Sequence, residues 1–129
     1  MIKTLIFIAL GGGIGSIARY LTTVLAAAML GPRLPWGTLA VNVIGGVVMG
    51  LITGAFEGRT HDADLRLFLT TGILGGFTTF SAFSLDAVRL MQNESLAIAG
   101  GYVVASVALA IAGVIFGLMA ARFLFMSAS

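Results

Sequence analysis

The chain has 129 residues, of which 59% are hydrophobic and only 9% are charged. Soluble domains carry about 45–50% apolar and about 25% charged residues, and so short a chain has too little interior to hide the excess apolar surface from water. The sequence contains no cysteine and one histidine, His61, which excludes disulfides, thiolate metal sites and histidine pairs. The net charge of +2 comes from basic residues scattered singly, a pattern that does not indicate nucleic-acid binding. The composition therefore predicts one small domain covered by lipid.

Four apolar stretches follow one another, separated by short polar segments. The predicted spans, in a single transmembrane domain of residues 1–129, are at about 4–30, 36–56, 65–91 and 96–121. Each can cross a bilayer core of about 30 Å as a helix. Helix is the expected form because four strands cannot close a barrel and every backbone amide must be paired inside lipid. The sequence thus predicts an all-α membrane protein with four spans.

The first stretch has an alternative interpretation as a cleaved signal peptide, because Lys3 precedes an apolar run from Leu5 to Leu10. The apolar character continues to Leu30, and Arg19 would follow the signal core awkwardly. A membrane span is therefore favoured.

The arginines and lysine leave the orientation of the four spans undecided. With four crossings, one membrane face carries Lys3, Arg59, Arg66 and Arg122. The other face carries Arg33 and Arg89, with Arg19 nearer to that side. So weak a bias permits insertion in both directions, and hence an antiparallel dimer, although a fixed orientation is equally compatible with the count.

Glycines spaced by four mark three of the spans, and such ridges let helix backbones approach closely in lipid. The ridges are Gly11 and Gly15, then Gly46, Gly50 and Gly54, then Gly113 and Gly117. The pattern predicts tight helix packing. Because four spans enclose little by themselves, a dimer is also expected.

The third stretch contains a glycine- and threonine-rich segment, residues 70–84, that is a poor uninterrupted helix. We expect a break between Gly75 and Thr79. Carbonyl groups freed there must meet protein, water or an ion, and they would suit a hard monovalent cation.

Aromatic and hydroxyl side chains follow the expected break. Phe77, Phe80 and Phe83 recur every three residues, which is typical of simple packing, but Ser81 and Ser84 are interleaved with them. The edge of an aromatic ring is positive, so ring edges with hydroxyl donors could replace part of the water around a small anion. The combination favours a conduction path.

Other polar residues at membrane depth each have two interpretations. Arg19 either reaches the interface or attracts an anion, and Asn42 either bonds a neighbouring helix or donates to a permeating anion. Tyr102 and Ser106 are compatible with interhelical hydrogen bonds or with the path. Asp86 lies near a mouth of the path or is a solvated helix end.

Three segments together resemble the Fluc/CrcB family of fluoride channels over nearly the whole chain. They are residues 11–20 (GGGIGSIARY), residues 35–42 (PWGTLAVN) and residues 70–84 (TTGILGGFTTFSAFS). The third segment is the most specific. The sequence departs from the family pattern at Phe77, Ala82 and Ala110, where another apolar residue, a threonine and a second serine on the fourth helix are usual.

The resemblance implies an antiparallel dual-topology homodimer with two pores, which exports cytoplasmic fluoride passively across the cell inner (plasma) membrane. It implies that Phe80 and Phe83 flank the fluoride path and that Asn42 is a donor to it. It further implies that Gly75 and Thr78 give backbone carbonyls to a structural sodium ion at the dimer interface. The remaining residues implied to line or shape the path are Arg19, Ser81, Ser84, Tyr102 and Ser106.

Two other functional classes compete with a channel. A small proton-coupled exporter of toxic cations would need a membrane-buried carboxylate, and Asp86 is the only candidate within the spans, near an end. A purely structural subunit would leave the polar break unexplained. An enzyme is not expected, because the sequence shows no nucleophile–base pair.

Overall fold

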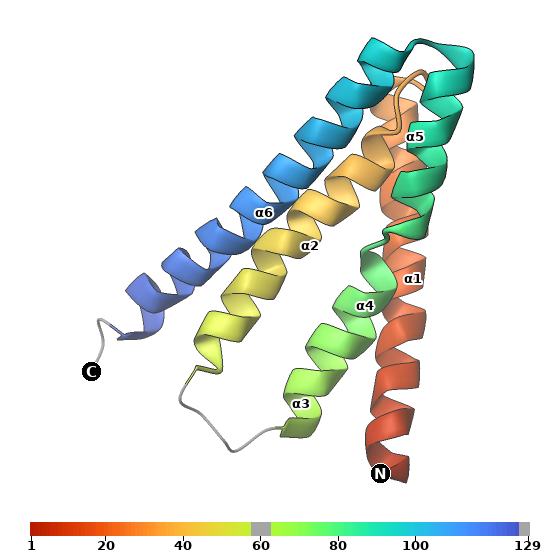
Figure 1. The fold of residues 1–129 in the computed structure, drawn as a ribbon. Helices are drawn as coiled ribbons and strands as arrows, with labels where there is room; N and C mark the ends of the chain where they lie inside the picture. Colours follow the sequence, from red (N-terminus) through yellow and green to blue (C-terminus); the bar gives the residue numbers. More distant parts are fainter. Residues whose placement is uncertain (58–62, 127–129) are drawn as a thin grey trace.

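The computed structural model describes residues 1–57 and 63–126, so Arg59 and His61 lie outside the described residues. Four long helical segments form the fold (Figure 1). In chain order the elements are α1 (Ile2–Leu30), α2 (Trp36–Ala55), α3 (Ala63–Leu67), the π-helix η1 (Phe68–Leu74), α4 (Gly75–Phe77), α5 (Ser81–Asn93) and α6 (Leu96–Met126). The elements α3 to α5 together make the third segment, which extends from Ala63 to Asn93. Each of the four segments is long and apolar enough to cross a membrane.

The turns between the segments follow from local chemistry. Gly31 ends α1 with a positive φ of 83°, a conformation that glycine adopts without strain. Pro35 precedes the first residue of α2, where its missing amide costs nothing. Ser95 starts α6 by accepting a hydrogen bond from the Ile98 amide at 3.2 Å, which satisfies a free helix-end donor.

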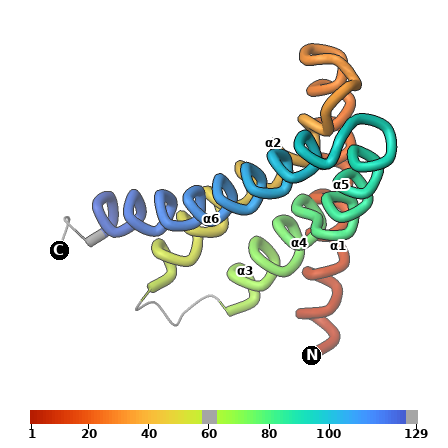
Figure 2. Tube along the Cα trace, turned by 45° about the horizontal axis from the view of Figure 1, so that its top comes forward, coloured from red at the N-terminus to blue at the C-terminus, as the bar shows by residue number. Residues whose placement is uncertain are grey.

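Helices α2 and α6 form one closely packed pair, and α1 packs along η1 and α4 (Figures 1 and 2). At Gly117 a β-carbon would meet the Val47 carbonyl oxygen, and at Gly15 it would meet that of Ile73. The glycine ridges in α1, α2 and α6 therefore permit backbone contact, as the sequence predicts.

Charged residues gather at the two ends of the molecule and form ion pairs that connect neighbouring segments. At one end, Lys3 pairs with Asp64 at 3.0 Å, and Arg122 pairs with Glu57 at 3.2 Å. At the other end, Arg33 makes two bonds to Glu94, at 3.3 and 3.1 Å. Hydrogen bonding to Glu94, and then its charge, raises the pKa of the Arg33 guanidinium.

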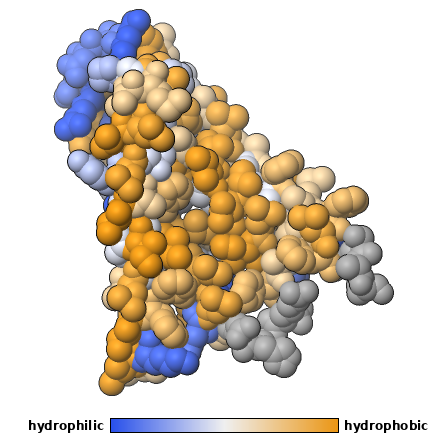
Figure 3. All heavy atoms as spheres, turned by 180° about the vertical axis from the view of Figure 1, so that it is seen from behind, coloured by the Kyte–Doolittle hydropathy of each residue, from blue (hydrophilic) through white to orange (hydrophobic). Residues whose placement is uncertain are grey.

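Between these charged ends the surface is apolar, and Figure 3 shows this for one face of the molecule. Exposed hydrophobic side chains are spread along α1 and α6. Such a surface is stable in lipid and not in water, so the chain is a multi-pass membrane protein.

The third segment is interrupted at residues 78–80, between α4 and α5. Thr78 turns to an extended conformation, with φ −80° and ψ 160°. The interruption was expected between Gly75 and Thr79, but Gly75 and Gly76 remain helical. A β-carbon at Gly76 would meet the Gly12 carbonyl oxygen of α1. This glycine therefore serves close packing against α1, and the chain leaves the helix only after it.

Candidate functional site

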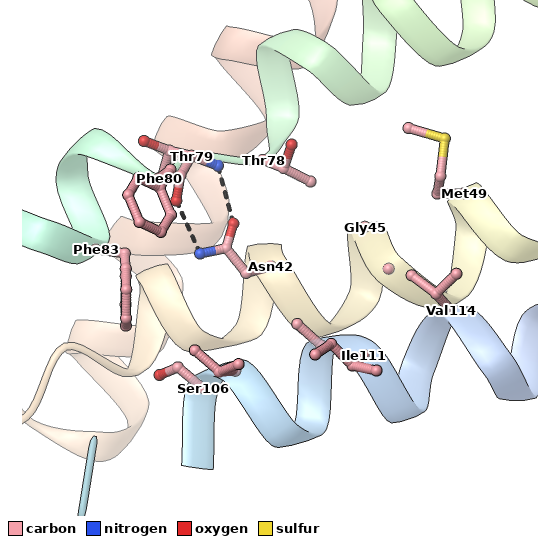
Figure 4. Close-up of a pocket in the computed structure, with 13 residues that line it drawn as sticks. Asn42, Gly45, Met49, Thr78, Thr79, Phe80, Phe83, Ser106, Ile111 and Val114 are labelled. Carbon is pink, nitrogen blue, oxygen red and sulfur yellow. Dashed lines mark hydrogen bonds between the residues drawn. The ribbon is translucent and has the colours of Figure 1, made fainter. Parts of the chain in front are cut away.

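Asn42 of α2 holds the interruption by bonding both backbone groups of Thr79. Its Nδ2 donates to the Thr79 carbonyl oxygen at 2.9 Å, and its Oδ1 accepts from the Thr79 amide at 2.8 Å (Figure 4). The amide side chain replaces the helical partners that Thr79 has lost. Of the two interpretations of Asn42, the structure contains the interhelical bond. One N–H of Nδ2 is still free to donate elsewhere, since a side-chain amide carries two donors.

A cavity of about 360 Å³ lies beside this contact, between α2, α6 and the interruption (Figure 4). It brings together Asn42, Phe80, Phe83 and Ser106, four of the residues predicted for the ion path. The remaining lining residues are Gly45, Gly46, Met49, Thr78, Thr79, Val107, Ala110, Ile111 and Val114. We call it the asparagine cavity.

Three aromatic rings form a continuous ladder at one end of the asparagine cavity. The ring centroids of Phe80 and Phe83 are 5.5 Å apart, and those of Phe83 and Tyr102 are 5.6 Å apart. Phe83 is buried, whereas Phe80 is 77% exposed. The ladder therefore runs from the interior of the chain to its surface, and Phe80 lies at the open end.

Two buried hydroxyl groups near this ladder form no hydrogen bond of good geometry with the described residues, although the Tyr102 hydroxyl lies close to those of Ser106 and Thr38. They belong to Tyr102 and Ser106, one helical turn apart on α6. Buried polar groups in proteins are nearly always bonded, so an unpaired one calls for an explanation such as a bound ion or water. The Ser106 hydroxyl is the one that lines the asparagine cavity.

Ser81 and Ser84 are placed differently from the cavity-lining residues. The Ser84 hydroxyl donates to the Phe80 carbonyl at 2.9 Å, one turn back on α5. The Ser81 hydroxyl lies 3.4 Å from that of Thr79. Neither serine is among the residues that line the asparagine cavity.

The backbone carbonyls of Gly75 and Thr78 are both released from regular helix bonding. In a continuous helix the Thr79 amide would donate to the Gly75 carbonyl, but it donates to Asn42 instead. The Thr78 carbonyl accepts one long bond, at 3.5 Å, from Nη1 of Arg19 on α1. Arg19 thus reaches the interruption rather than only the interface.

Thr38 and Thr79 are site residues that the sequence reading missed. The Thr38 hydroxyl donates to Oδ2 of Asp86 at 2.6 Å, so Asp86 is bonded to α2 and is not a freely solvated helix end. Thr38 stands four residues before Asn42, on the same face of α2. That spacing was the signal that could have found it. Thr79 acts through its backbone and also through its hydroxyl, which accepts a hydrogen bond from the Ala82 amide at 3.1 Å and caps the start of α5. A threonine just before an expected helix is a capping signal that could have found it.

The fold and the site together define a class: a four-span membrane protein whose third span is interrupted beside a cavity lined by a buried serine hydroxyl. A family model described as CrcB-like protein, Camphor Resistance (CrcB), matches residues 6–118. This chain belongs to that family.

Curated relatives are similar over almost their whole length. A protein of Agrobacterium fabrum (strain C58) is 48% identical over 119 residues, which is 92% of this chain and 95% of the relative. A protein of Rhizobium etli (strain CIAT 652) is 50% identical over 116 residues, 89% of this chain and 93% of the relative. One of Rhodopseudomonas palustris (strain BisB5) is 49% identical over 121 residues, 92% and 97% respectively. All three are named fluoride-specific ion channel FluC.

Proposed function

We propose that this chain is the subunit of a fluoride-selective channel, through which fluoride leaves the cytoplasm passively across the inner membrane. The relatives' names support the substrate and a non-enzymatic role. The structural observation that carries the proposal is the buried, unpaired Ser106 hydroxyl in the same cavity as Asn42, Phe80 and Phe83.

The asparagine cavity has the chemistry that a small, strongly hydrated anion requires. To enter it, fluoride must exchange water for other donors, and the Ser106 hydroxyl and the second N–H of Asn42 can supply two. The edges of the Phe80 and Phe83 rings add weak positive charge. Donors of this kind lower the cost of dehydration without a full positive charge that would trap the ion.

The other predicted path residues take supporting roles in this proposal. Tyr102 extends the aromatic ladder and offers a second unpaired hydroxyl. Ser84 and Ser81 stabilise the start of α5, where the Phe80 ring is presented. Arg19 holds the interruption from the α1 side and supplies the positive charge that attracts an anion.

A structural sodium ion fits the released carbonyl groups of Gly75 and Thr78. Each chain provides two such oxygens, and a second copy would bring the number to four, a donor set that suits a hard monovalent cation. The Thr78 carbonyl now accepts a bond from Arg19, but at 3.5 Å this bond is weak and could be exchanged for the ion at little cost. When bound, the ion would supply a fixed positive charge that holds two interruptions together.

An antiparallel dual-topology homodimer is the assembly we propose. Phe80 projects from the chain with 77% of its surface exposed, so a partner is needed to complete the wall of the path. The near-even division of basic residues between the two faces is compatible with insertion in both directions. Two antiparallel copies would place two equivalent paths side by side.

A fluoride efflux assay on the purified protein in liposomes tests the function. The proposal expects rapid fluoride release when the membrane potential is collapsed, and no comparable release of chloride. Cation-driven proton movement in the same vesicles tests the exporter, which needs a titrating carboxylate. Proton-coupled cation transport without fluoride release would overturn the channel proposal.

A further inference from the structure

Two further cavities with charged lining residues are lined by α1, α2 and α5, whereas the asparagine cavity is lined by α2, α6 and the interruption. We call them the inner and the outer polar cavity. The inner polar cavity has a volume of about 420 Å³, and its polar lining includes Arg19, Thr38, Thr79, Asp86 and Arg89. It shares Thr79 with the asparagine cavity, so the two spaces meet at one residue.

The outer polar cavity continues the inner one toward the turn between α1 and α2. Its volume is about 490 Å³, and it is lined by Pro32, Arg33 and Glu94 at the membrane face. The two polar cavities share Thr23, Thr38, Asp86 and Arg89. Together they extend from the turn between α1 and α2 to Thr79, a residue that also lines the asparagine cavity.

The charges along this route are unevenly compensated. In the outer polar cavity Arg33 is matched by its two bonds to Glu94. In the inner one, the single negative charge of Asp86 offsets only one of Arg19 and Arg89. Arg89 has no hydrogen bond or ion pair to any of residues 1–57 and 63–126. With Arg89 the inner cavity carries one net positive charge, and without it the charges would cancel.

We infer that Arg89 is the residue that makes this entry route attractive to anions, and that it gathers a hydrated fluoride ion before the ion loses water at Thr79. The inference rests on the proposed function. A cleft lined by one sign of charge concentrates ions of the opposite sign, and the effect weakens as salt screens it. A monovalent anion matches the single excess charge of the inner polar cavity.

The test compares fluoride efflux from liposomes for the wild type, Arg89→Gln, Arg89→Lys and Arg66→Gln. Arg66 is the matched control, because it is an exposed arginine at the opposite end of the same segment and lines none of the three cavities. Each protein is first shown by gel filtration to keep the wild-type assembly.

At an ionic strength of about 0.01 M, where charges act over about 30 Å, Arg89→Gln should lower the efflux rate by about threefold to tenfold. At about 1 M salt, where the range falls to about 3 Å, the deficit should nearly vanish. Arg89→Lys and Arg66→Gln should stay within about twofold of the wild type.

Unchanged flux in Arg89→Gln, or a deficit that is equal at both salt concentrations, would overturn the inference while leaving the channel intact. Loss of fluoride flux in the wild type itself would instead remove the proposed function. An equal, salt-dependent deficit in Arg66→Gln would assign the effect to net charge rather than to the entry route.

Discussion

Replacing Asn42 by leucine, a side chain of similar size, removes the two hydrogen bonds that hold Thr79 at the interruption. Intramolecular hydrogen bonds contribute about 0.5–1.5 kcal/mol each, and interhelical bonds in membrane proteins average about 0.6 kcal/mol. The two bonds therefore account for about 1–3 kcal/mol. The variant also leaves the Thr79 amide and carbonyl without partners in an apolar setting, which adds to the loss because lipid offers no substitute.

We expect Asn42→Leu to be less stable than the wild type by about 2–4 kcal/mol and to lose fluoride flux. The measurements are denaturant-induced unfolding in mixed micelles and efflux from liposomes. Asn42→Asp keeps the acceptor for the Thr79 amide but sets a carboxylate oxygen against the Thr79 carbonyl oxygen in an apolar setting. It should therefore lose flux and be no more stable than Asn42→Leu.

Thr22→Val is the control for Asn42→Leu, because the Thr22 hydroxyl bonds only the Ala18 carbonyl of its own helix, at 2.9 Å. Its effect on both measurements should be small. If Asn42→Leu kept both the stability and the flux of the wild type, the hydrogen bonds between Asn42 and Thr79 would not be what holds the interruption.

Three further predictions concern the ring ladder, the helix packing and the cation. Phe80→Ile and Phe83→Ile should each sharply reduce fluoride efflux while the protein still purifies as folded, and full flux in both would refute the role of the rings. Gly117→Ala should destabilise the protein by about 2 kcal/mol or more in thermal unfolding, because the added methyl group would meet the Val47 carbonyl oxygen. Gly100→Ala on the same helix is the control, since its methyl group would meet nothing within 4 Å, and it should be neutral or stabilising. Replacing sodium by a large organic cation should lower the thermal stability of the dimer, and identical melting curves in the two buffers would contradict a sodium ion at Gly75 and Thr78.

The spans and the main packing ridges could be predicted from the sequence because they depend on local properties. Length and hydropathy determine which segments cross a membrane, and a spacing of four places glycines on one helix face. The spacing alone predicted the glycines at close helix contacts, which are Gly11, Gly15, Gly46, Gly50, Gly113 and Gly117.

The position of the interruption depends on contacts between distant residues, and the sequence therefore located it only roughly. Asn42 and Thr79 are 37 residues apart, and their bonds decide which peptide leaves the helix. Two of the glycines that suggested the break, Gly72 and Gly76, are needed instead where the third segment meets α1. Similarly, the sequence could not decide whether Asp86 is a solvated helix end, because its hydrogen-bond donor, Thr38, belongs to another helix.

The π-helical geometry of η1 has a consequence for how the third segment can be compared and altered. Its hydrogen bonds run from each residue to the fifth one along, so the side chains before and after it are out of phase with a uniform α-helix. A helical wheel drawn through residues 68–74 therefore assigns the wrong face on one side. Deleting one residue there would allow ordinary i→i+4 bonds to form, so α3 would keep its orientation and Asp64 its contacts with Lys3 and Thr4. The same deletion in an α-helical part of the segment would instead turn its two halves by about 100°. The wide turn is thus the place where this span tolerates a change of length.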